Sequence, residues 1–194
     1  MNIQLTSEDR LEILRYLGYR NSELSQQTED DIADCILMTN DLKDVRSVWR
    51  LFDISYTEEG TLLNDTVFKG ESLKKHLNGA DKGVLLAVTI GNDFDAAVNR
   101  LMITNPSKGV ILNSCGITLT EKAADELQKE IEGKLSDIKT GVRFSPGYGD
   151  LPIETQKDFI RLLDAERKAG IRLNENMLMN PLKSVSAVCA VIPK

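Results

Sequence analysis

The chain has 194 residues, of which 41% are hydrophobic and 28% are charged, and its net charge is −6 at pH 7. These values are typical of one globular domain, with or without an extra lobe. The acidic balance argues against a nucleic acid as partner, because nucleic-acid-binding surfaces are basic. The sequence contains no apolar run of about 18 residues, the length a membrane-spanning helix needs, so no membrane association is expected.

The few cysteine and histidine residues limit the available chemistry. Cys35, Cys115 and Cys189 lie far apart, and no two of them have the spacing of zinc ligands. An odd, sparse set of cysteines suits a reducing compartment, and the first nine residues lack the features of a signal peptide, so we expect a cytoplasmic protein. His76 is the only histidine, which leaves little for nucleophilic catalysis. We expect no catalytic residue and no metal site.

Two helices are predicted before residue 45. Thr6 and Asp9 have the spacing of a capping box, and the helix that follows is expected to end near Gly18. Thr28 and Asp31 repeat this start signal before a second helix. Several residues share one face of that second helix at helical spacing: Ile32, Cys35, Ile36 and Thr39.

A hairpin and a short helix are predicted next. Residues 45–56 are rich in β-branched and aromatic side chains, which indicates a strand. A turn at Glu59-Gly60 leads into residues 61–68, the expected hairpin partner. Gly70 and Gly79 then bracket a short helix.

The continuous apolar run at 83–90 predicts a central strand, because both of its faces can be buried. Asn92, with Asp95 three residues later, is expected to cap a helix that Pro106 ends. The turn at 88–93 lacks the spaced glycines of a nucleotide-binding fingerprint, so a capped strand-to-helix turn is preferred.

A long helix is predicted from about residue 107 to 135. Its inward residues are expected to be Ile117, Ala124, Leu127, Ile131 and Leu135. Gly109 and Gly116 weaken it by roughly 1 kcal/mol each relative to Ala, so we expect them to mark close packing on the sheet. The carboxylates between 121 and 132 lack metal-ligand spacing and indicate a solvated helix face.

The C-terminal part predicts three more strands and one helix. These elements are a strand at 142–145, a helix from Pro152 to about Ala169 capped by Asp150 or Leu151 and ended by Gly170, and strands at 171–173 and 184–192. Helices and strands occur in groups and not in regular βαβ alternation, so the predicted fold class is α+β.

The loop at 143–152 is the main candidate site. Arg143 offers a planar fork of donors suited to a carboxylate, and Tyr148 offers a flat apolar face with a polar tip. Gly147 and Gly149 tolerate positive φ and let a ligand approach the backbone. Two interpretations stay open here: a site for an amino-acid-like or nucleoside-like ligand, and a plain turn with Tyr148 packed in the core.

Several segments in order resemble one known family. They are the strand after Ala80-Asp81, the long helix around Thr120 to Asp125, the run Arg143-Phe144-Ser145-Pro146-Gly147-Tyr148, and two later segments at 170–175 and 179–186. The third matches an Arg-x-x-x-Gly-Tyr signature. The stretch from about 80 to 192 resembles the activation (reactivation) domain of cobalamin-dependent methionine synthase.

This resemblance implies a fold, a ligand and a partner. The family has a twisted, mainly antiparallel sheet flanked by helices, and it binds S-adenosylmethionine. It supports reductive remethylation of cob(II)alamin, with cobalamin held here by a partner methionine synthase chain and with a flavodoxin or ferredoxin as electron donor. Methionine synthase activity would require that partner.

The resemblance also implies roles for six residues. Arg143 would bind the ligand's carboxylate, Glu121 its ammonium, and Tyr148 would flank the ligand. The backbone around Ser145, Pro146 and Gly147 would address the adenine. From spacing alone, Glu121 is equally well explained as a solvated helix carboxylate.

Some features depart from the family pattern. Gly149-Asp150-Leu151-Pro152 replaces a Cys-Pro sequence, and residues 1–75 do not map clearly onto the large enzymes. The family's chains continue beyond the position of Lys194 with another aromatic near the ligand. We therefore expect a free-standing, single domain over 1–194. The alternatives are a docking protein that has lost ligand binding and an activator of another corrinoid methyltransferase.

Overall fold

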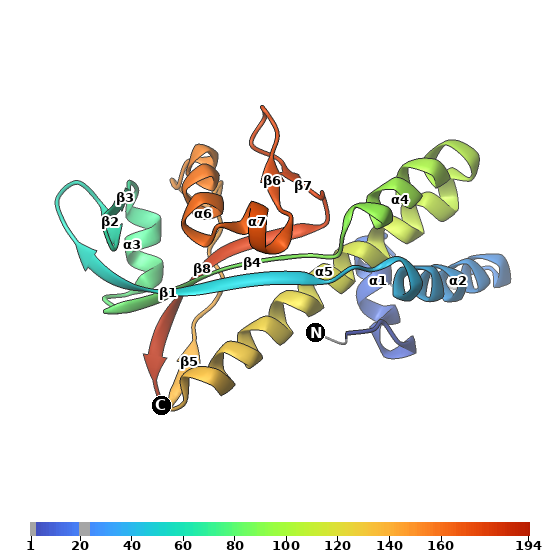
Figure 1. The fold of residues 1–194 in the computed structure, drawn as a ribbon. Coiled ribbons are helices and arrows are strands. Elements are labelled where there is room, and N and C mark those ends of the chain that lie inside the picture. Colours follow the sequence, from blue (N-terminus) through green and yellow to red (C-terminus); the bar gives the residue numbers. More distant parts are fainter. Residues whose placement is uncertain (1–2, 20–23) are drawn as a thin grey trace.

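The computed structural model describes residues 3–19 and 24–194 of the chain. Within these ranges the centre of the fold is a six-stranded sheet in the order β3-β2-β1-β4-β8-β5, and every neighbouring pair is antiparallel. Its strands are β1 (Arg46–Tyr56), β2 (Thr61–Leu63), β3 (Thr66–Phe68), β4 (Lys82–Thr89), β5 (Ile138–Thr140) and β8 (Ser184–Pro193). A separate ribbon consists of β6 (Arg172–Leu173) and β7 (Met179–Asn180). The predicted α+β class with a mainly antiparallel sheet is confirmed (Figure 1).

Helices cover both faces of this sheet (Figure 1). One face is covered by α1 (Arg10–Tyr16), α2 (Gln26–Leu42), α4 (Asn92–Thr104) and α5 (Pro106–Leu135). The other face is covered by α3 (Glu71–Leu77), α6 (Gln156–Leu163) and α7 (Ala165–Ala169). The sheet therefore separates two hydrophobic cores, one on each side.

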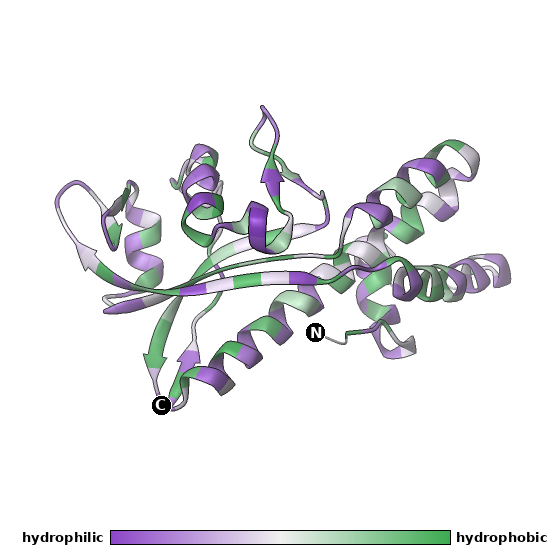
Figure 2. Ribbon diagram, viewed as in Figure 1, coloured by the Kyte–Doolittle hydropathy of each residue, from purple (hydrophilic) through white to green (hydrophobic). Residues whose placement is uncertain are grey.

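Strand β4 contributes to both cores, which explains its unbroken apolar sequence. Val84, Leu86 and Val88 face the core that contains α5, whereas Leu85 and Ala87 face the core that contains α6. Alternate side chains of a strand point to opposite faces, so a central strand with helices on both sides has no solvated face. Figure 2 shows the corresponding hydrophobic colouring along β4 and on the sheet-facing side of α5.

The N-terminal capping box is confirmed, whereas the second helix begins earlier in the chain than predicted. The Thr6 side chain accepts a hydrogen bond from the backbone of Glu8, and its backbone N–H donates to Asp9. Helix α2 begins at Gln26, because Ser25 Oγ accepts from the backbone N–H of Thr28. Thr28 is thus the partner of a cap and not the cap itself.

The strand predicted at 45–56 and the short helix between Gly70 and Gly79 are confirmed. The expected hairpin partner at 61–68 is instead two short strands, because Asn64 adopts a left-handed conformation with φ of 51° and turns the chain. Of these two strands only β2 pairs with β1, whereas β3 pairs with β2. Asn tolerates this conformation better than most residues, so the turn has a local cause.

The close packing expected at the glycines of α5 exists, but its partner is α4 and not the sheet. A Cβ on Gly109 would lie 2.8 Å from the backbone nitrogen of Met102. A Cβ on Gly116 would collide with the ring of Phe94. Pro106 ends α4 as expected and opens α5, whereas Asn92 is the first residue of α4 and does not cap it.

The described helices differ from membrane spans in length or in polarity. None of those formed by residues 3–19 and 24–194 is both long and apolar enough to cross a bilayer. The longest, α5, has 30 residues but carries a charged outer side.

Candidate functional site

The chain between β5 and α6 crosses the edge of the sheet as an irregular segment. The strand expected at 142–145 is reduced to a single bridge, in which Phe144 and Val188 exchange two backbone hydrogen bonds of 2.9 Å each. The side chain of Ser145 adds a bond of 2.8 Å to the carbonyl of Ser186. These contacts anchor the start of the loop to β8.

The end of the loop is anchored to α3, which lies far away in the sequence. The carboxylate of Asp150 accepts hydrogen bonds from the backbone N–H groups of Ser72, at 2.9 Å, and Glu71, at 2.8 Å. These bonds lower the pKa of Asp150. The prediction that Asp150 caps the following helix is therefore wrong, because its carboxylate caps α3. The helix predicted from Pro152 to about Ala169 is preceded by a 3-10 turn, η2 (Ile153–Thr155). It is also divided into α6 and α7, because Asp164 between them adopts a left-handed conformation with φ of 53°.

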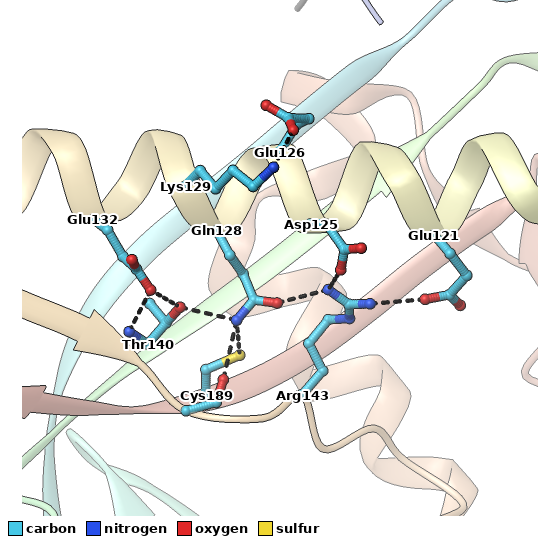
Figure 3. Close-up of polar contacts among 10 residues, drawn as sticks. Glu121, Asp125, Glu126, Gln128, Lys129, Glu132, Thr140, Arg143 and Cys189 are labelled. Atoms are coloured by element: carbon cyan, nitrogen blue, oxygen red, sulfur yellow. Dashed lines mark hydrogen bonds and ion pairs between the residues drawn. The ribbon is translucent and has the colours of Figure 1, made fainter. Parts of the chain in front are cut away.

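Arg143 points from the loop to α5, where three acceptors hold its guanidinium (Figure 3). Nη1 donates to Asp125 Oδ1 and to Gln128 Oε1, each at 2.6 Å, and Nη2 donates to Glu121 Oε2 at 2.8 Å. Burial opposes the charge of the guanidinium, but the contacts with Asp125 and Glu121 raise its pKa above the ordinary value. Arg143 is therefore a fixed cation at this edge of the fold.

A cleft of about 480 Å³ lies beside this ion pair. Five of the six predicted binding residues line it: Glu121, Arg143, Ser145, Pro146 and Tyr148. The remaining wall comes from residues that were not among the predicted binding residues, although five of them lie in the segment 179–186 that resembles the family: Val142, Ile153, Gln156, Met177, Leu178, Met179, Leu182, Ser184, Val185 and Ser186. The loop, α5, the β6-β7 ribbon and β8 thus meet at one place.

The sixth residue, Gly147, lies in the same loop but not in the wall of the cleft. It adopts φ of 89°, and its backbone N–H donates to Leu151 at 2.9 Å. Tyr148 is 59% exposed, so the interpretation in which this ring packs in the core is wrong. The loop is a rigid turn that presents an aromatic side chain next to a cleft.

The model of the family described as "Vitamin B12 dependent methionine synthase, activation domain" matches residues 73–194. The chain belongs to this family. The activation-domain match contains the whole loop, all of α5 and β8, and it begins within α3, a few residues before the start of the resemblance noted in the sequence.

A solved structure similar to this activation domain shares its fold. It is the crystal structure of the MetH reactivation domain bound to AdoHcy, with a TM-score of 0.71 and 16% sequence identity. The match covers 99% of this chain and 78% of that chain. The shared fold therefore includes the N-terminal part that the family model leaves out.

His76 of the activation domain supports the loop from the side of α3. Its ring lies 4.7 Å from that of Phe144, centroid to centroid, and Nε2 lies 2.7 Å from the carbonyl oxygen of Val142. Phe144 in turn meets the ring of Tyr148 edge to face at 6.1 Å. His76, the only histidine, lies on the surface of a helix as predicted, and from there it contacts the loop.

The sequence analysis did not identify the polar side chains that accept hydrogen bonds from Arg143. Asp125 and Gln128 lie four and seven residues after Glu121, so all three share one face of α5. Their spacing was visible, but nothing in the sequence indicated that this face lies opposite residue 143.

Proposed function

We propose that this activation domain binds S-adenosylmethionine in the cleft and supports reductive remethylation of cob(II)alamin in a methionine synthase. The observation that carries the proposal is the pairing of Arg143 with Glu121 in the wall of the cleft. A ligand with a carboxylate and an ammonium group matches this pair, because each charged side chain meets its opposite. The volume of about 480 Å³ falls within the usual range of about 300–1,000 Å³ for small-molecule sites.

Arg143 retains donors for a ligand carboxylate. A guanidinium has five N–H donors, and the three contacts with α5 leave Nε–H and one Nη2–H. Among the described residues, the hydrogen bonds of the guanidinium come from Nη1 and Nη2, and none comes from Nε. Glu121 uses Oε2 for Arg143, and its side chain is 44% exposed, so its other oxygen is open to an ammonium group.

Tyr148 and the loop backbone would hold the rest of the ligand. The exposed ring of Tyr148 offers a face that attracts a sulfonium cation. The backbone of Ser145, Pro146 and Gly147 would address the adenine, and it is held in place by the bonds to β8 and to Leu151. This loop then orients the methyl donor, and no side chain needs to transfer a proton.

The corrinoid would belong to the partner. Cobalamin, held by a cobalamin-binding methionine synthase chain, would supply the metal centre for methyl transfer. A flavodoxin or ferredoxin would deliver the electron. Cys35, Cys115 and Cys189 are free and buried, which suits a protein of the reducing cytoplasm.

Isothermal titration with S-adenosylmethionine tests the ligand. We expect Arg143→Ala to weaken binding by about 1.5–3 kcal/mol, because it removes hydrogen bonds between charged groups. Arg167→Ala is a matched control, since Arg167 lies on α7 and pairs only with the nearby Asp164 among the described residues. Unchanged affinity in the Arg143 variant would remove this residue from the site.

Reconstitution tests the role. The chain is mixed with a methionine synthase that lacks its own activation domain, together with S-adenosylmethionine and a reduced flavodoxin or ferredoxin. We expect activity to recover from the oxidised corrinoid. No recovery, despite measurable ligand binding, would point to a partner from another corrinoid methyltransferase system.

A docking protein without a ligand is the second candidate. The observation that favours it is that α5 already supplies three acceptors to Arg143, two of them carboxylates, so the charge of the guanidinium is balanced without a ligand. A folded chain that captures a cobalamin protein, but gives no heat with S-adenosylmethionine at high micromolar concentration, would establish this alternative.

A further inference from the structure

A chain of hydrogen bonds leads along α5 to the guanidinium of Arg143. Both the backbone N–H and the hydroxyl of Thr140 lie 2.8 Å from Glu132 Oε1. Gln128 Nε2 lies 2.9 Å from the hydroxyl of Thr140 and 3.0 Å from the carbonyl oxygen of Gly141. Gln128 Oε1 faces Arg143 Nη1 at 2.6 Å (Figure 3).

The direction of each bond follows from the chemistry of the groups. An ionised carboxylate can only accept, so the single hydroxyl hydrogen of Thr140 goes to Glu132. The hydroxyl oxygen of Thr140 then accepts from Gln128, and the carbonyl of Gly141 accepts the second hydrogen of the same amide. Reversing this amide would place its N–H groups against the guanidinium, which has no acceptor. The oxygen of Gln128 is therefore fixed toward Arg143.

We propose that Gln128 is a positioning residue for the ligand's carboxylate, which acts by holding Arg143 in its binding orientation. This inference rests on the proposed function. Gln128 does not line the cleft, so it would act through Arg143 and not on the ligand directly. It is also neutral, and it therefore orients the guanidinium without cancelling its charge, unlike Asp125 and Glu121.

The contact between Gln128 and Arg143 would raise the affinity for the ligand by preorganising the arginine side chain. An arginine side chain has several rotatable bonds, and immobilising it on binding reduces affinity. In the domain described here, Arg143 is already held by α5 and is only 19% exposed. The ligand would meet a guanidinium whose remaining donors are already in place.

The test compares Gln128→Leu with the wild type for two ligands. S-adenosylmethionine carries the carboxylate, whereas 5′-methylthioadenosine lacks the whole amino-acid part. We expect Gln128→Leu to weaken S-adenosylmethionine by about tenfold, as is typical when a residue that orients a ligating side chain is lost. Binding of 5′-methylthioadenosine should not change. In an Arg143→Ala background, Gln128→Leu should have no further effect on S-adenosylmethionine.

Two more variants support the comparison. Thr140→Val removes the hydroxyl that fixes the amide, and we expect a smaller loss in the same direction. Glu126→Gln is the control, because Glu126 pairs with Lys129 on the outer side of α5, away from Arg143 (Figure 3). Circular dichroism identifies any variant that does not fold, and Thr140→Val replaces Gln128→Leu in that case.

Each outcome decides the matter. Unchanged S-adenosylmethionine affinity in a folded Gln128→Leu protein, or an equal loss for both ligands, would overturn the positioning role while leaving the proposed function intact. A wild-type protein that binds neither ligand would overturn the proposed function, and this inference with it.

Discussion

Arg143 brings together two demands that normally conflict, a permanent charge and partial burial. Its side chain is 19% exposed, and two carboxylates face the guanidinium and favour its charged form. Those carboxylates are themselves exposed by 44% and 59%, so water screens their charge. The result is a charged guanidinium that keeps two N–H donors for a ligand carboxylate.

Under the proposed function, Tyr148 would favour a ligand with a sulfonium over a neutral one. We expect Tyr148→Leu to weaken S-adenosylmethionine by roughly 0.5–2 kcal/mol, because the sulfonium loses an aromatic face. S-adenosylhomocysteine has a neutral thioether, so its affinity should fall less. Tyr148→Phe retains the ring and serves as the control. Titration of both ligands measures the difference, and equal losses would show that Tyr148 contributes contact area alone.

At the scale of elements, the loop is fixed by the helix cap that it provides. The pKa of Asp150 is lowered by hydrogen bonds from the N–H groups of Ser72 and Glu71, so only the ionised form has these bonds at full strength. Its contribution to stability is therefore present above the unfolded pKa, about 3.9 for Asp, and is lost as the pH falls through the folded value.

We expect Asp150→Ala to melt at a lower temperature than the wild type at pH 7. Below about pH 3.9 this gap should narrow, because protonation removes the same bonds from the wild type. Thermal melts followed by circular dichroism at several pH values measure the gap. A constant gap across the pH range would mean that Asp150 stabilises the protein by packing and not through its charge.

The contact between α4 and α5 gives a second prediction at this scale. Gly109→Ala places a Cβ 2.8 Å from the backbone of α4, which cannot move aside easily, so we expect a loss of about 1–3 kcal/mol in the free energy of unfolding. Gly133→Ala lies on the same helix, with no described atom within 4 Å of its new Cβ, and should gain up to about 1 kcal/mol. Urea denaturation measures both, and a stabilised Gly109 variant would contradict the packing.

Local sequence patterns predicted the bounds of helices and strands better than the contacts between residues on different elements. The apolar run of β4 and the pattern of α5 specify their own conformations, and both were predicted nearly to their ends. The cap that Asp150 provides to Ser72, and the face that Gln128 turns to Arg143, join residues far apart in the chain or on different elements. No local pattern encodes such pairs. Arg143 and Tyr148 could be singled out because their residue types are unusual in a glycine-rich loop, whereas Gln128 could not.

At the scale of the whole molecule, the two cores depend on one sheet. The family model begins at residue 73, so β1 and the N-terminal helices lie outside it. Strand β1 pairs with β4 along Arg46 to Asp53, and Ile13, Ile32 and Cys35 belong to the core that contains α5. If 1–194 is a single domain, as predicted, residues 73–194 would thus not fold without the N-terminal part.

A fragment of residues 70–194 tests this dependence. It keeps α3 and the loop whole, but it removes β1 and exposes one edge of β4 together with part of the apolar surface under α5. Unpaired backbone groups and exposed core residues both disfavour folding. We expect the fragment to show no cooperative thermal transition by circular dichroism, and addition of a separate chain of residues 1–69 to restore one. A fragment that melts cooperatively near the temperature of the whole chain would show that the family-matched part is a domain by itself, with the N-terminal elements as an addition to it.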